Sequence, residues 1–136
     1  MTSFPLKIVS PDGLIFDGPA EKVIVRTVTG DMGFLAKHIN CVAPLGMGRA
    51  VIEADGKRRE AACIGGMISV VNGEVTLVPT TFEWADKIDS QRAEASYQRT
   101  QKVLQNKDSS DTDIRLAEAR LKRALVRKSV ASSGNY

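Results

Sequence analysis

The sequence predicts an α+β protein in which a β-sandwich is followed by a hairpin of two helices. Turn-forming residues give the first indication, because all five prolines and ten of the eleven glycines precede residue 80. Charge divides the chain at a similar point: residues 1–84 have 8 Lys or Arg and 9 Asp or Glu, whereas residues 85–136 have 11 and 7. We therefore assign residues 1–84, with a net charge of −1, to a turn-rich β domain, and residues 85–136, with +4, to a helical hairpin domain.

Strand-forming runs alternate with turn signals throughout residues 1–84. Residues 23–28 are rich in Val, Ile and Thr, as strands are. Asp55-Gly56 and Asn72-Gly73 each separate two such runs, and these dipeptides favour the two-residue turns that close β-hairpins. Short strands with a turn about every 8 to 12 residues are typical of a sandwich or a flattened barrel. No helix of useful length fits before residue 85.

Residues 86–106 are predicted to form the first helix. They contain no Gly or Pro and are rich in Ala, Gln, Arg and Lys, which are good helix formers. Asp86 is suited to cap the start of this helix, and Asp89 to its first turn, where the helix dipole favours an acid.

The second helix is predicted over residues 114–130, after a polar break at residues 107–113. Residues 131–136 are expected to be frayed. Its apolar stripe consists of Ile114, Ala117, Leu121, Ala124 and Leu125. The first helix offers only Ile88, Ala95, Val103 and Leu104 besides small alanines. Such faces bury little apolar area, so we expect a loosely held hairpin that can move.

The composition excludes several classes of protein and of site. No apolar run approaches the roughly 18 residues needed to span a bilayer, and the N-terminus has no pattern of an export signal. Cys41 and Cys63 lack metal-ligand spacing and are expected to be buried free thiols in a reducing cytoplasm. Asp108, Asp111 and Asp113 lack the glycine and glutamate of a calcium loop, so no metal site is predicted.

No catalytic constellation is evident in the sequence. The single histidine, His38, lies three residues from Cys41, but this proximity does not orient a nucleophile and a base. No phosphate-binding loop of the GxxxxGK[ST] type occurs. Nucleic-acid binding is disfavoured, because Tyr97 and Tyr136 are the only aromatic residues after Trp84 on which bases could stack.

The arginines of the helical region are the most informative polar residues. Asp89, Arg92 and Arg99 are spaced to share one face of the first helix. Three further arginines share one face of the second helix: Arg120, Arg123 and Arg127. If the two faces converge, several guanidinium groups can hold a polyphosphate. The alternatives are an acidic partner surface and a simple solvated face.

Five segments together resemble one protein family. They are LKIVSPDG (6–13), GDMGFLAKH (30–38), GGMISVV (65–71), IDSQRA (88–93) and LKRALVR (121–127). In this order, and over essentially the whole length, the chain resembles the epsilon subunits of bacterial F-type ATP synthases. The resemblance implies a ten-stranded β-sandwich followed by an antiparallel two-helix hairpin.

The resemblance also implies a place for the chain in a larger assembly. It would be a non-catalytic subunit of the central rotor, peripheral on the cytoplasmic face of the cell membrane and not inserted in it. The sandwich would bind the gamma subunit and the c-ring and help to couple proton flow to rotation. Asp31 and His38 are then the candidate contacts with the c-ring.

In the bacterial family members the hairpin is a regulatory element. It folds against the sandwich or extends toward the alpha and beta subunits, where it inhibits ATP hydrolysis. The resemblance thus implies contacts with the beta subunit from four residues: Arg120, Lys122, Arg123 and Arg127.

Some members bind ATP as a regulatory ligand in the folded-down state, although no cofactor is required. The motif Ile/Leu-Asp-x-x-Arg-Ala is intact here as Ile88, Asp89, Arg92 and Ala93. Four further residues match positions used in such members: Glu83, Arg99, Arg123 and Arg127. An ATP-sensing switch and a ligand-independent brake therefore both stay open. A cytosolic β-sandwich adaptor with a basic hairpin and no nucleotide sensing is the alternative should the resemblance not hold.

Overall fold

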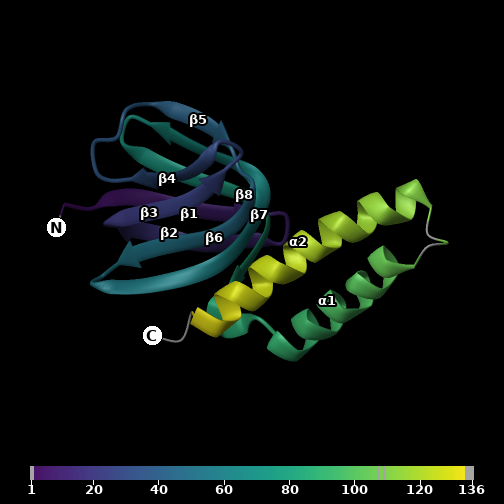
Figure 1. Cartoon of the computed structure of the whole chain (residues 1–136). Helices are drawn as coiled ribbons and strands as arrows, with labels where there is room; N and C mark the ends of the chain where they lie inside the picture. The colour runs from purple at the N-terminus through teal and green to yellow at the C-terminus, as the bar shows by residue number, and fades with distance from the viewer. Residues whose placement is uncertain (1, 107, 109, 134–136) are drawn as a thin grey trace.

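The computed structural model describes residues 2–106, 108 and 110–133, which form a β-sandwich with a helical hairpin beside it (Figure 1). Its strands pair in the order β2-β1-β8-β7-β6-β3-β4, with β5 added to β7. The strand bounds are β1 (Phe4–Ser10), β2 (Gly13–Ala20), β3 (Lys22–Thr27), β4 (Gly30–Phe34), β5 (Cys41–Pro44), β6 (Met47–Ala54), β7 (Lys57–Val71) and β8 (Glu74–Trp84). All eight are antiparallel to their neighbours except β1 against β8.

The sandwich core follows from the alternation of apolar residues along the strands. In β1, for example, Phe4, Leu6 and Ile8 are buried while the residues between them are exposed. Their counterparts on the facing strands are mostly branched aliphatic residues, and the largest fully buried side chain is Phe34. Cys63 is also buried, and burial raises the pKa of its thiol to about 12, whereas Cys41, which was expected to be buried too, is only half-buried.

The described residues form eight strands rather than the ten that the resemblance implies. The difference arises because β7 and β8 continue through a sharp bend, and each serves two parts of the sheet. The first half of β7 pairs with β6 and the second half with β5. At the bend, Gly65 and Gly66 adopt φ angles of +69° and +99°, which L-residues rarely adopt.

The helical region begins with a single 3-10 turn, η1 (Ala85–Lys87), followed by α1 (Ser90–Gln105) and α2 (Asp111–Ser133). No helix precedes residue 85 in the described part of the chain, as predicted. The predicted cap at Asp86 is wrong, because η1 intervenes and Asp89 is the N-cap: its Oδ1 accepts from the backbone N–H of Arg92 at 3.0 Å.

The second helix is longer than predicted. It begins at Asp111 rather than residue 114, since Ser110 caps it by accepting from the N–H of Asp113 at 3.1 Å. It also includes residues 131–133 of the segment expected to fray, while residues 134–136 lie outside the described residues.

The interface between α1 and α2 is made of small side chains. The fully buried residues there are Ala93, Thr100, Ala117 and Ala124. Ala95, which was assigned to the apolar face of the first helix, is exposed, and so are Val103 at 38% and Leu125 at 45%. Since small residues bury little apolar surface, the weakly apolar hairpin that the sequence indicates is present in the structure.

The C-terminal end of α2 attaches the hairpin to the sandwich, and the N-terminal end of α2 lies away from it (Figure 1). Val130 is 1% exposed and packs in a cluster with Ala62 and Ala85, against the half-buried Ile88 and Val126. This small apolar cluster fixes the last turns of α2 next to η1.

Arg49 on β6 adds a polar clamp to the same attachment. Its Nη2 donates to the carbonyl oxygen of Ser129 at 3.1 Å and to the Ser129 hydroxyl at 2.8 Å, and its Nη1 donates to the buried carboxylate of Glu60 at 3.1 Å. A guanidinium beside carbonyls near the C-terminal end of a helix also interacts favourably with the helix dipole.

Substitution of Gly66 tests the bend in β7. In Gly66→Ala, an ideal Cβ would lie 2.0 Å from the carbonyl oxygen of Val78, at a φ that L-residues disfavour. We expect a loss of about 3 kcal/mol in the free energy of unfolding, measured by urea denaturation. Gly33→Ala is the control, because its Cβ would meet only Ile24 at 3.9 Å. Equal stability of the two variants would contradict this account of the bend.

Substitution of Arg49 tests the clamp. Arg49→Ala removes both hydrogen bonds to Ser129, so the last turns of α2 should open more often, and their amide hydrogens should exchange about 10-fold faster. Arg58→Ala is the matched control, because Arg58 also pairs with Glu60, at 3.4 Å, from an exposed position on β7. Exchange in α2 that does not change in Arg49→Ala would show that the clamp does not hold the hairpin.

Candidate functional site

Glu83 and Arg127 form the ion pair that links β8 to α2. The Nε of Arg127 lies 2.8 Å from Oε1 of Glu83, and Nη2 donates to Oε2 at 3.2 Å. The Nε contact is ionic and poorly aligned for a hydrogen bond. Both side chains are partly shielded, at 21% and 30% exposure, so solvent screens this pair less than a pair at the open surface.

A cavity of about 190 Å³ lies beside this ion pair, where α2 passes the middle of β7 and the last residues of β8; we call it the inner cavity. The polar residues lining it are Thr81, Glu83, Ser96, Arg120, Arg123 and Arg127. The structure therefore brings together three of the predicted nucleotide-binding residues, Glu83, Arg123 and Arg127.

A second and larger cavity of about 770 Å³ lies between the two helices; we call it the interhelical cavity. Arg99 lines it and does not line the inner cavity, so the predicted set of arginines is divided between the two. The cavities share Ser96 and Arg120 in their linings, which makes them neighbours. Four arginines of the two predicted faces thus converge, as one of the alternatives from the sequence requires.

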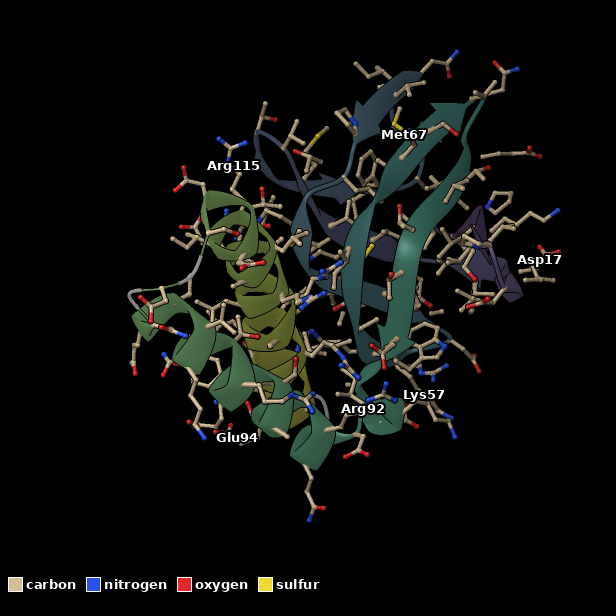
Figure 2. All side chains as sticks on the ribbon, turned by 90° about the vertical axis from the view of Figure 1, so that its right-hand side faces the viewer. Asp17, Lys57, Met67, Arg92, Glu94 and Arg115 are labelled. Atoms are coloured by element: carbon tan, nitrogen blue, oxygen red, sulfur yellow. The ribbon has the colours of Figure 1, made fainter. Side chains whose placement is uncertain are left out.

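The Ile-Asp-x-x-Arg-Ala motif lies where η1 leads into α1. Asp89 caps α1, Ala93 is fully buried, and Ile88 packs against the cluster around Val130. Figure 2 shows Arg92 on the side of α1 that faces the sheet. In the structure the motif fixes the start of α1, and it supplies one exposed guanidinium near the sandwich.

The predicted contacts with the beta subunit do not all have the same exposure. Arg120, Lys122 and Arg123 are exposed, whereas Arg127 is half-buried in its pair with Glu83. With the hairpin folded against the sandwich, Arg127 is already engaged by a carboxylate of its own chain.

The two predicted c-ring contacts lie in and after β4. Asp31 is exposed and accepts from Nε of Arg26 at 2.7 Å. His38 is half-buried, with its ring centroid 4.8 Å from that of Phe34 and its Nδ1 2.8 Å from the carbonyl oxygen of Ile39. Neither residue lines the inner or the interhelical cavity, but Asp31 lines a separate pocket with Ser129 and Val130 of α2.

The sequence does not indicate two further contacts, one between the two helices and one within the sandwich just before η1. Lys128 on α2 pairs with Glu94 on α1 at 2.5 Å, and its Nζ lies 4.1 Å from the ring centroid of Tyr97. A hydrogen bond from Gln98 and the pairing with Lys128 lower the pKa of Glu94. Arg59 stacks over Trp84 at 3.7 Å, just before η1. The sequence does contain opposite charges on the two helices, but which of them pair depends on the register of α1 against α2.

The described residues contain no group of three or more His, Cys, Asp or Glu side chains that could hold a metal ion. None of the helices in that part of the chain is long and apolar enough to cross a membrane.

Two family models match the chain, one for each structural part. The model described as "ATP synthase, Delta/Epsilon chain, beta-sandwich domain" matches residues 3–85. The model described as "ATP synthase, Delta/Epsilon chain, long alpha-helix domain" matches residues 86–132. The resemblance carried by the sequence segments is thereby confirmed.

Individual relatives agree with the family models. The ATP synthase epsilon chain of Bacillus velezensis is 42% identical over 133 residues, covering 98% of this chain and 100% of the relative. That of Bacillus subtilis is 44% identical over 115 residues, covering 85% and 86%. A chain in the cryo-EM structure of Euglena gracilis mitochondrial ATP synthase has the same fold, with a TM-score of 0.84 at 20% identity over 95% of this chain and 81% of that one. The chain thus belongs to the ATP synthase delta/epsilon family, as a non-catalytic epsilon-type subunit of the central stalk.

Proposed function

We propose that this subunit regulates ATP hydrolysis through its hairpin, and that ATP binding favours the hairpin folded against the sandwich. The sandwich docks on the gamma subunit and the c-ring at the cytoplasmic face of the membrane, and the hairpin exchanges between the sandwich and the alpha and beta subunits. Membership of the family removes the alternative of an unrelated cytosolic adaptor.

The observation that carries the proposal is the convergence of arginines on two neighbouring cavities, one between the two helices and one between the hairpin and the sandwich. Arg99, Arg123 and Arg127 come from both helices and line these cavities together with Glu83 of β8. Guanidinium groups are planar donors that match phosphate oxygens. A ligand bound there contacts both helices and the sandwich, so it stabilises the folded-down arrangement by mass action.

Attachment of the hairpin through a few contacts supports the exchange between two positions. The described side-chain hydrogen bonds and ion pairs from α2 to the sandwich come from Arg127 and Ser129, and the deepest apolar contact is Val130. A helix held by so few groups is suited to be a two-state element, because modest differential contacts elsewhere can compete with them.

Titration of the full chain with ATP by calorimetry tests the nucleotide site. We expect saturable heat at or below millimolar ATP, and at least a 10-fold loss of affinity in Arg123→Ala, which removes a charged donor from the inner cavity. Arg115→Ala is the control, because Arg115 is exposed at the far end of α2 (Figure 2) and lines neither cavity. No heat at millimolar ATP would exclude nucleotide sensing and leave the ligand-independent brake.

Truncation after Trp84 tests the brake. Trp84 pairs with Ala61 at the end of β8, so this truncation keeps every strand and removes η1 and both helices. We expect the assembled complex to hydrolyse ATP faster than the complex with the full chain, and co-purification with the gamma subunit serves as the control for assembly. Unchanged hydrolysis by the correctly assembled complex would remove inhibition from the proposed function.

Asp31 and His38 remain the candidates for the c-ring contact. Asp31 is exposed although it pairs with Arg26, and both residues line a pocket beside Ser129 and Val130 in the last turns of α2. The half-buried ring of His38 contacts Phe34 and the carbonyl oxygen of Ile39.

A further inference from the structure

Arg120 lines both cavities of the hairpin, and the family motif does not include it. Along α2, Arg120 lies between Leu116 and Ala117, which line the interhelical cavity, and Arg123, which lines the inner cavity. Ser96 of α1 is the other residue common to both linings. The junction between the two cavities is therefore formed by one hydroxyl group and one guanidinium group, from different helices.

We infer that Arg120 is a further phosphate-binding residue, which holds an extended polyphosphate where the two cavities meet. This inference rests on the proposed function and adds to it the residue that joins Arg99 in one cavity to Arg123 in the other. It also gives Arg120 a role in the folded-down state, beside its expected contact with the beta subunit in the extended state.

The charges around the two cavities favour an anion with several negative charges. Arg127 is compensated by Glu83, whereas Arg99, Arg120 and Arg123 have no ion pair or side-chain hydrogen bond among the described residues. The other acid lining the cavities, Asp113, belongs to the first turn of α2 at the end of the interhelical cavity near the inter-helix turn. All three arginine side chains are exposed and without a carboxylate partner among the described residues, so each can donate to an anion that enters the cavities.

The arrangement also favours a long anion over a single phosphate group. Arg99 lies in the interhelical cavity and Arg123 in the inner cavity, so one small anion in either cavity leaves the arginine of the other without a partner. A chain of linked phosphate groups can contact both, and Arg120 lies at the point where such a chain passes from one cavity to the other. A triphosphate has this chemistry, whether it is inorganic or carried by a nucleoside.

Calorimetric titration of the full chain with ATP, and separately with inorganic tripolyphosphate, tests the role of Arg120. We expect Arg120→Ala to weaken the binding of both ligands by about 10-fold to 100-fold, as the loss of a charged hydrogen-bond donor should. Lys122→Ala is the matched control: it removes one positive charge two residues away on α2, from an exposed side chain that lines neither cavity, and its affinities should stay within about 2-fold of the wild type.

The possible outcomes separate this inference from the proposed function. Wild-type affinity for both ligands in Arg120→Ala would overturn the role of Arg120 and leave ATP sensing intact. An equal loss in Arg120→Ala and Lys122→Ala would also overturn it, because the effect would then be one of overall charge. Absence of binding of either ligand to the wild type at millimolar concentration would overturn both. A second variant, Arg120→Lys, should recover part of the affinity, since it restores the charge without the planar fork.

Discussion

The position of the whole hairpin depends on how the last turns of α2 are held against the sandwich. Three residues close together in sequence make this attachment: Arg127 pairs with Glu83, Ser129 accepts from Arg49, and Val130 enters the small apolar cluster next to η1. The attachment determines where α2 lies, and α1 is placed in turn by its contacts with α2. The inner cavity exists because of this docking arrangement, whereas residues of the hairpin alone line the interhelical cavity.

The interface between α1 and α2, like the attachment of the hairpin to the sandwich, buries little apolar surface. Ala93, Ala117 and Ala124 allow the two helices to approach closely, but they bury little apolar surface, so packing alone provides modest stability. Opposite charges contribute across the same interface, as in the pair of Lys128 with Glu94. The sandwich differs in kind, because its branched and aromatic side chains form a continuous core between two layers. A rigid domain with a weakly attached second one is suited to a subunit that stays docked while one part changes position.

The arginines of the two helices take part both in docking the hairpin on the sandwich and in lining the cavities. In the folded-down chain Arg127 contributes to docking, whereas Arg99, Arg120 and Arg123 face the cavities without a carboxylate partner in the described residues. A polyphosphate and an acidic protein surface offer the same kind of partner to these groups, so the two uses exclude one another. Competition for one set of guanidinium groups is a simple physical basis for a switch, because binding of either partner lowers the population available to the other.

The sequence by itself determined the two-part architecture, since the distribution of Gly, Pro and charge marks the end of the sheet at Trp84, and turns such as Asn72-Gly73 are set by local backbone preferences. It also indicated which helix faces carry the arginines. Only the tertiary structure decided that Asp89 rather than Asp86 caps α1, that Glu83 engages Arg127, and that Arg99 and Arg123 line different cavities joined by Arg120. These features depend on the register of α1 against α2 and on the docking of α2, which are contacts between residues far apart in the chain, and no local pattern encodes them.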